Sequence, residues 1–326
     1  MYQYIPLTDE GGLGITPGHA AQAPIINPIN GKIVMATTGA SSLATEGEVL
    51  AQIIAQGKAL GEVNPIITFI NLAIAARDIN DWLDTSDTLK SCWNKTTEAL
   101  NVAGLNYSDI QIIWLKEDDL KDQSADDGRI VRLFWKFVDL IHLLKEKFPN
   151  LKRIYVSGRS CTLPQADVKH AEPRPFFTGL VAKMLVQEQI AGNPELDLSV
   201  CPWISDILYL WTNEDMPRES DGYGRSMDSW KNDGIHPNEI GDDQVATYVY
   251  NTLLDYTDFF PAGGSVERNA PWFDDTPYEP IPVDEYYDPG TYNNGNPVQQ
   301  SGSNAGAVLI GLGVLYGLSK LFKKRT

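Results

Sequence analysis

The sequence is short of cationic side chains, cysteine and histidine. It has 26 Lys and Arg against 43 Asp and Glu, which gives a formal net charge of −17. A mainly basic nucleic-acid-binding protein is excluded, because a phosphate backbone needs a cationic surface. Cys92, Cys161 and Cys201 are widely spaced, and the 4 histidines form no H-x-x-x-H or H-E-x-x-H pattern. Buried thiols are therefore expected, rather than a disulfide framework, a zinc cluster or another metal site.

Apolar residues, in contrast, are plentiful. They make up 43% of the 326 residues and include 8 Trp, enough to bury the core of one large domain or two small ones. From Lys32 to about Asp258, short β-type runs alternate with segments of helical period. Strands are predicted at Lys32–Thr37, Ile66–Asn71, Ile110–Leu115, Arg153–Ser157 and Ile207–Trp211, and helices at Ser42–Gln56, Leu89–Ala103, Gly128–Lys147, Phe177–Ala191 and Glu239–Phe260. This order predicts a three-layer α/β/α sandwich around a mostly parallel five-stranded sheet.

Both ends of the chain differ from this domain, which is placed at 32–273. Residues 1–31 are rich in Gly, Pro and Ala and have neither a basic start nor an apolar stretch typical of a secretory signal. They are predicted to form an arm that lies on the domain. Residues 274–304 are first acidic and then rich in Asn, Gly and Ser, which is typical of a linker.

The last segment, 305–326, is an apolar run with a basic tail. Ala305 to Phe322 is roughly 18 residues, or about 27 Å as a helix, close to the thickness of a bilayer core. A single-pass membrane anchor is predicted, with the lipid bilayer as partner; the alternative is a buried C-terminal helix. Gly313 and Gly317 form a G-x-x-x-G pattern, which would let a second copy of this helix approach closely.

The orientation of this anchor stays open. Positive charge favours the cytoplasmic or inner side, which would put the domain outside, in a cell envelope or on a virion membrane. The sequence shows no N-terminal signal that would carry the domain there. Tail insertion, a non-standard export route and assembly in a membrane-containing virion would each satisfy both observations.

The most specific string is Asp233-Gly234-Ile235-His236-Pro237-Asn238, just before the last predicted helix. A carboxylate three residues before a histidine in a turn can accept the Nδ1–H of the imidazole. Nε2 is then left to take a proton from a nucleophile. The alternative is a solvated turn with a surface histidine.

A nucleophile is available after the first predicted strand, in Gly39-Ala40-Ser41-Ser42. A serine between a strand and a helix lies where backbone N–H groups and the helix dipole can receive an oxyanion. The alternative is that Ser41 or Ser42 is merely the N-cap of the helix.

Together these strings resemble the SGNH (GDSL-like) hydrolases, whose nucleophilic serine follows the first strand and whose D-x-x-H-P block lies near the end. The resemblance covers about 31–273 and implies a flavodoxin-like SGNH fold. It also implies Ser41 as nucleophile, His236 as general base and Asp233 as its orienting carboxylate, with no cofactor. The backbone N–H groups of Ser41 and Ala76 are implied as oxyanion-hole donors.

This chain departs from the family pattern in three places. Ala40 replaces the acid of G-D-S, Ala76 stands at the glycine of the second block, and Lys116 stands at the asparagine of the third. Lys116 could stabilise an oxyanion as a cation, or could pair with Glu117 or Asp118 instead.

The resemblance, together with the anchor predicted at 305–326, predicts a membrane-tethered serine ester hydrolase that removes O-acyl groups, such as acetyl, from carbohydrate. Arg159, at the carboxyl edge of the sheet, and Asn71 are predicted substrate contacts; the alternative for Arg159 is a salt bridge at the rim. His142 is predicted on a helix face, and His170 in a loop that borders the cleft. The rival hypothesis is a catalytically weak or inactive module of the same fold that binds glycan or protein.

Overall fold

The computed structural model describes residues 23–263, except 87, 89, 90, 127, 219 and 220, together with the short strands β6 (Tyr292–Asn293) and β7 (Asn296–Pro297). Within residues 23–263, one parallel sheet has the order β2-β1-β3-β4-β5. Its strands are β1 (Ile33–Gly39), β2 (Ile67–Ile70), β3 (Ile110–Lys116), β4 (Arg153–Val156) and β5 (Trp203–Ser205). The strand order reverses between β1 and β3, so the crevice beyond their carboxyl ends is where such folds bind ligands.

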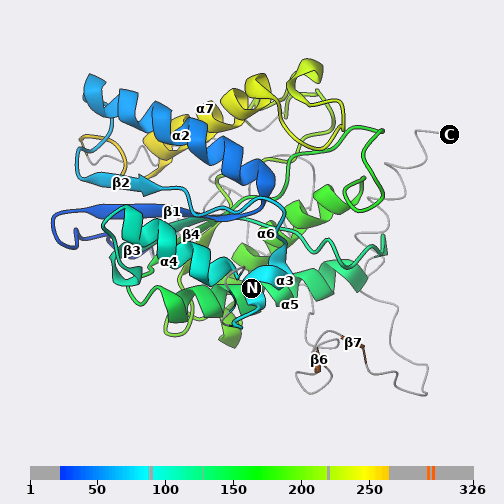
Figure 1. Cartoon of the computed structure of the whole chain (residues 1–326), viewed down its shortest axis with the longest axis horizontal. Coiled ribbons are helices and arrows are strands. Elements are labelled where there is room, and N and C mark those ends of the chain that lie inside the picture. The colour runs from blue at the N-terminus through cyan, green and yellow to red at the C-terminus, as the bar shows by residue number, and fades with distance from the viewer. Residues whose placement is uncertain are drawn as a thin grey trace.

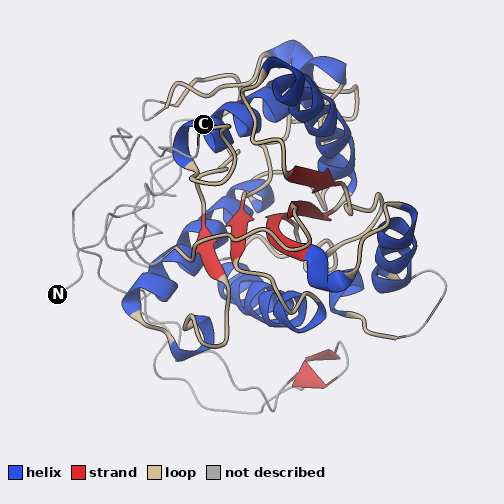
Figure 2. Ribbon diagram, turned by 90° about the vertical axis from the view of Figure 1, so that its left-hand side faces the viewer, coloured by secondary structure: helices blue, strands red, loops and turns tan. Residues whose placement is uncertain are grey.

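Helices cover both faces of this sheet (Figure 1). They are α2 (Ser41–Leu60), α3 (Ile79–Leu83), α4 (Cys92–Val102), α5 (Gly128–Lys147), α6 (Arg174–Ala191) and α7 (Glu239–Tyr256). α2 packs against α7 on one face, and α5 packs against α6 on the other. Figure 2, turned by 90°, shows the strands between the two helical layers. The α/β sandwich with a parallel five-stranded sheet is thus as predicted.

The central strand β3 shows why both layers are needed. Ile113 and Leu115 lie in the core under α4, α5 and α6, whereas Ile112 and Trp114 lie in the core under α2 and α7. Successive side chains of a strand point to opposite faces, so a strand with helices on both sides is apolar throughout. All four side chains are fully buried.

The fifth strand is Trp203–Ser205, and the prediction of Ile207–Trp211 was wrong. Residues 207–211 are buried and apolar, which is why they read as a strand. Their backbone is satisfied in another way, because Arg218 donates to the carbonyl oxygens of Tyr209 and Trp211. Burial of an apolar run therefore did not require pairing in the sheet.

Smaller differences concern the ends and the short elements. The prediction missed α3, whose capping box joins Asp78 and Asp81, and extended the last helix to Phe260 although it ends at Tyr256. The three cysteines are buried free thiols, as expected. No helix among residues 23–263 is long and apolar enough to cross a membrane, and the span predicted at 305–322 lies outside the described residues.

Candidate active site

A cavity of about 560 Å³ lies at the carboxyl end of the sheet. Its lining includes Ser41, Ala76, Lys116, Arg159, His170 and His236, which come from six separate segments of the chain. Ser41 and Lys116 follow or end β1 and β3, the two strands between which the strand order reverses. The cavity is therefore at the ligand-binding position of this class of sheet.

Ser41 is the first residue of α2, directly after the turn that ends β1. The N-cap of α2 is Ala40, which makes no side-chain cap bond, so neither Ser41 nor Ser42 serves as the cap. Gly39 is required at the turn, because a Cβ there would lie 2.3 Å from the carbonyl oxygen of Lys116. Close packing of β1 on β3 thus sets where the Ser41 hydroxyl emerges.

The loop after β2 is held to β1 by side chains. Thr37 donates to Asn71 Oδ1 at 2.6 Å and accepts from the backbone N–H groups of Leu72 and Ala73. Asn71 donates in turn to the carbonyl oxygen of Ala44. Asn71 was predicted to contact substrate; its amide holds the loop in place, and the residue is not part of the cavity lining.

Ala76 lies further along the same loop and lines the cavity. Its φ is +58°, in the left-handed region that favours glycine. The family resemblance placed a glycine at this position, and the backbone keeps the conformation a glycine would have. The loop therefore keeps a glycine-like backbone at the cavity wall despite the added Cβ.

His236 is held by the turn predicted from the D-x-x-H string. Asp233 Oδ2 contacts His236 Nδ1 at 2.8 Å, while Oδ1 accepts from the backbone N–H groups of Ile235 and His236. Burial acts to raise the pKa of Asp233, but the hydrogen bonds from His236 and Ile235 outweigh it and lower the pKa to about 2. An ionised carboxylate only accepts hydrogen bonds, so the proton of the neutral imidazole lies on Nδ1.

The other imidazole nitrogen reaches the serine. Ser41 Oγ and His236 Nε2 are 2.9 Å apart, although 195 positions separate them in the chain. Together with the contact to Asp233, this gives an unbroken relay of serine, imidazole and carboxylate. The geometry is that of an activated serine nucleophile.

Lys116 is not paired with Glu117 or Asp118. Its ammonium donates to both carboxylate oxygens of Glu46 on α2, at 2.6 and 2.7 Å, and both side chains are buried. Burial lowers the pKa of Lys116 even though Glu46 acts to raise it. This ion pair joins β3 to α2, and it holds the Lys116 ammonium against the Glu46 carboxylate.

Arg159 forms a salt bridge, which was one of the two alternatives raised for it. Its Nη1 lies 3.0 Å from Asp118 Oδ2, and the side chain lines the cavity. The other oxygen of Asp118 pairs with buried Arg129. Arg159 is therefore fixed by a salt bridge at the wall of the cavity.

Two residues of the cavity wall were not predicted as site residues. Burial raises the pKa of Glu117 well above its usual value, and the residue lines the cavity. Asp167 contacts His170 Nδ1 at 2.7 Å, and both side chains line the cavity. The signal that could have revealed this second pair is its spacing, because Asp167-x-x-His170 repeats that of Asp233-x-x-His236.

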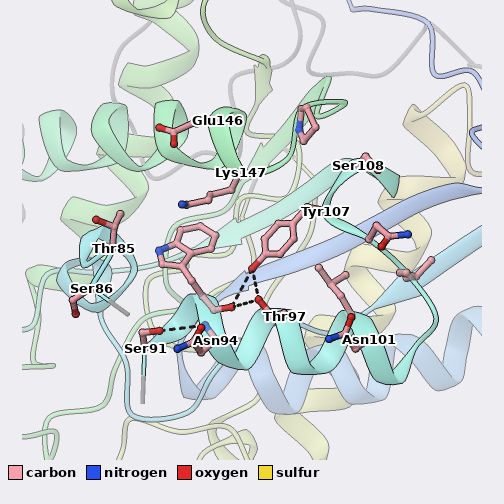
Figure 3. Close-up of a pocket in the computed structure, with 15 residues that line it drawn as sticks. Thr85, Ser86, Ser91, Asn94, Thr97, Asn101, Tyr107, Ser108, Glu146 and Lys147 are labelled. Carbon is pink, nitrogen blue, oxygen red and sulfur yellow. Dashed lines mark hydrogen bonds between the residues drawn. The ribbon is translucent and has the colours of Figure 1, made fainter. Parts of the chain in front are cut away.

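A larger hollow of about 750 Å³ lies elsewhere on the surface and shares no lining residue with the Ser41 cavity (Figure 3). Its lining is mainly neutral hydroxyl and amide side chains around Trp93 and Tyr107. The Tyr107 hydroxyl donates to the carbonyl oxygen of Trp93 and meets Thr97 Oγ1 at 2.9 Å. The lining contains neither histidine nor cysteine, so it offers no nucleophile and base pair comparable to Ser41 and His236.

No family model matches the chain, and no curated protein matches its sequence. Solved structures do resemble its fold. A carbohydrate esterase of family 3 from Talaromyces cellulolyticus is 12% identical, with a TM-score of 0.40; the match covers 68% of this chain and 96% of that one. An acetyl esterase with acetate ion gives 12% identity, a TM-score of 0.39 and the same coverage.

A third similar structure is the catalytic domain of a peptidoglycan O-acetyltransferase from Streptococcus pneumoniae. It is 11% identical, with a TM-score of 0.33, and the match covers 68% of this chain and 93% of that domain. At such identities the likeness concerns the fold, and the chemistry of this chain rests on the geometry of its own side chains. The solved structures that this chain resembles thus include two esterases and an O-acetyltransferase.

Proposed function

We propose that the chain is a serine ester hydrolase with Ser41 as nucleophile. The observation that carries the proposal is the relay in which Ser41 Oγ lies 2.9 Å from His236 Nε2, and His236 Nδ1 lies 2.8 Å from Asp233 Oδ2. Each residue has the partner that its role requires. The relay also opens onto a cavity large enough for a small ester.

The reaction would proceed in two steps. Ser41 attacks the ester carbonyl while His236 takes its proton and then passes it to the leaving alkoxide, which leaves an acyl group on Ser41. Water, deprotonated by His236, releases the acid and restores Ser41. Asp233 stays ionised throughout, because its pKa of about 2 keeps it a carboxylate at neutral pH.

The oxyanion would be received by backbone N–H groups rather than by Lys116. Ser41 is the first residue of α2, so its N–H has no partner within the helix and lies at the positive end of the helix dipole. The second donor is the Ala76 N–H, in the loop held by Thr37 and Asn71. Lys116 contributes indirectly, because its bond to Glu46 fixes β3 against α2.

The proposed substrate is an O-acylated carbohydrate, with acetyl as the first acyl group to test. A cavity lined by both cationic and anionic side chains, with Arg159 paired to Asp118 and His170 to Asp167, suits a neutral polar molecule better than a strongly charged one. We also retain the proposal of a membrane anchor at Ala305–Phe322, with self-association through Gly313 and Gly317 and the basic tail on the cytoplasmic or inner side of a cell-envelope or virion membrane.

The deciding experiment is labelling of the full chain in detergent with a fluorophosphonate probe, followed by peptide mass spectrometry and an aryl-acetate assay on the same sample. We expect one adduct, on Ser41, and its loss in His236→Ala. The matched control is Ser42→Ala, which leaves the relay intact and should still be labelled. An adduct on Ser42 instead would mean that the nucleophile is wrongly assigned.

The rival hypothesis, a binding module without catalysis, predicts a different result. A folded chain that gives neither adduct nor turnover would support it. The anchor is tested separately, by comparing the full chain with a chain that ends at Phe273. The full chain should enter the detergent phase and the shorter one should stay in the aqueous phase; equal partitioning would exclude the anchor.

A further inference from the structure

The cavity contains two histidines that are each paired with an aspartate three residues earlier. His170 Nδ1 lies 2.7 Å from Asp167 Oδ1, and His236 Nδ1 lies 2.8 Å from Asp233 Oδ2. In both turns the aspartate also accepts a backbone N–H, from Lys169 in the first and from the histidine itself in the second. The same Asp-x-x-His turn therefore occurs twice at the wall of one cavity.

The two imidazoles differ at their second nitrogen. His236 Nε2 meets Ser41 Oγ at 2.9 Å. His170 Nε2 has no hydrogen-bond partner among the described residues, although the side chain is only 19% exposed. Because Asp167 holds the proton on Nδ1, Nε2 of the neutral ring presents a lone pair. Burial and then Arg159 lower the pKa of His170, against the effect of Asp167, so the ring is neutral at physiological pH.

The position of this lone pair relative to the reaction follows from the packing of the two loops. Leu163 N–H donates to the carbonyl oxygen of Gly234 at 2.9 Å, and a Cβ on Gly234 would lie 2.8 Å from Gln165. The loop that carries His170 is therefore stacked on the turn that carries His236. His236 is the group that returns a proton to the leaving alcohol, so the alcohol part of the ester lies on this side of Ser41.

We propose that His170 and Asp167 form the subsite for the alcohol part of the substrate, in which His170 Nε2 accepts a hydrogen bond from a hydroxyl close to the scissile ester. The ligand class is a polyol ester with a free neighbouring hydroxyl, such as a partly acylated sugar. The inference rests on the proposed ester hydrolysis and adds the feature that selects its substrate. A buried acceptor that a ligand leaves unpaired disfavours that ligand, which is how a site discriminates for a hydroxyl.

The test compares two esters that differ only in whether their hydroxyls are free or methylated. A methyl hexopyranoside carrying one O-acetyl group is assayed beside the same compound with its remaining hydroxyls methylated. For the full chain, the free-hydroxyl ester should have a kcat/KM about tenfold higher than the methylated one. His170→Leu should remove this preference, whereas His170→Gln, which keeps an acceptor oxygen, should retain part of it.

Val168→Ala is the matched control, because Val168 is an exposed residue of the same turn and does not line the cavity. It should keep the full preference. A wild-type chain that shows no preference, or a His170→Leu variant that keeps it, would overturn the subsite while leaving ester hydrolysis intact.

A binding measurement separates failure of the subsite from failure of catalysis. In Ser41→Ala, addition of methyl hexopyranoside should shift the Hε1 NMR resonance of His170 in a saturable way and leave that of His142 in place. His142 is a suitable reference because it bonds to the carbonyl oxygen of Glu195, outside the cavity. If the chain hydrolyses no ester, the proposed function fails, yet this shift would still support the subsite. Absence of the shift would overturn the subsite whatever the activity.

Discussion

The turns at 233–236 and 167–170 have the same spacing and nearly the same internal bonds, yet they differ in what meets the imidazole. In both, hydrogen bonds from the histidine help to lower the pKa of the aspartate. Ser41 occupies Nε2 of His236, whereas Nε2 of His170 faces no protein partner among the described residues. The comparison teaches that the Asp-x-x-His spacing fixes a tautomer, while the role of the histidine is decided by what the rest of the fold places at its other nitrogen.

The strongest way to break this comparison is to remove each carboxylate in turn. Asp233→Asn should lower kcat for an aryl acetate by about 10³- to 10⁴-fold, because the tautomer that serves Ser41 is lost. Asp167→Asn should lower it by less than about tenfold, since His170 does not contact the nucleophile. Steady-state kinetics of the two variants, each checked for native circular dichroism, gives the answer. Equal losses would show that both turns act on Ser41.

The next effect concerns the support of the 167–170 turn. Glu172 accepts from the backbone N–H of Thr162, whose hydroxyl holds the carbonyl oxygen of His170, and from Trp211 Nε1. Burial raises the pKa of Glu172 to about 7 despite these hydrogen bonds. The folded chain therefore binds a proton more tightly than the unfolded one, so stability is highest below the ordinary pKa of the glutamate and falls as pH rises towards 7.

Glu172→Gln should remove that loss. A shift of this size corresponds to at most about 3 kcal/mol, and the partial exposure of the residue reduces the figure, so about 1–3 kcal/mol is expected. Urea unfolding at pH 5 and pH 8 measures it: the wild type should lose stability between the two values by that much more than the variant. A variant with the same pH dependence as the wild type would mean that Glu172 titrates normally.

The sequence was a good guide wherever a local pattern fixes local geometry. The first strand, predicted at Lys32–Thr37, runs to Gly39, and the helix predicted from Ser42 begins at Ser41. With the turn at 233–236, these elements bring Ser41 and His236 together. The turn at 233–236 depends on neighbours along the chain, because Asp233 accepts hydrogen bonds from the N–H groups of its own turn.

The sequence was a poorer guide where the fold, rather than a local spacing, decides the partner of a side chain. Lys116 pairs with Glu46, 70 positions away, and no spacing in the sequence links them. Asn71 is a polar residue at the edge of the sheet, which suggested a ligand contact. Its amide instead accepts from Thr37 and donates to the carbonyl oxygen of Ala44. The strand predicted at Ile207–Trp211 is a buried loop, in which Arg218 donates to the carbonyl oxygens of Tyr209 and Trp211.

Two adjacent threonines on β1, Thr37 and Thr38, test how the loop after β2 is held near Ser41. Both are fully buried. The Thr37 hydroxyl bonds to Asn71 and to the N–H groups of Leu72 and Ala73, while the Thr38 hydroxyl has no hydrogen-bond partner. Thr37→Val should destabilise the fold by about 2 kcal/mol, because it leaves the buried N–H of Leu72 without its acceptor. Thr38→Val should be neutral or stabilising. Urea unfolding of the pair tests this, and equal effects would mean that Thr37 does not hold the loop.

The smallest effect is expected at Ala76, whose N–H is proposed to receive the oxyanion. At a φ of +58°, Ala76 bears the cost of a left-handed conformation, about 1–2 kcal/mol for a residue with a Cβ. Ala76→Gly removes that cost but gives the unfolded chain more freedom, so a net gain of about 0.5–1 kcal/mol is expected. Ala75→Gly, whose φ is not positive, supplies only the second term and should lose stability by a similar amount. If Ala76→Gly raises the free energy of unfolding and Ala75→Gly lowers it, the chain tolerates strain at Ala76 to keep a glycine-like backbone in the cavity. If both changes have the same sign, Ala76 is unstrained and its N–H is not held for the oxyanion.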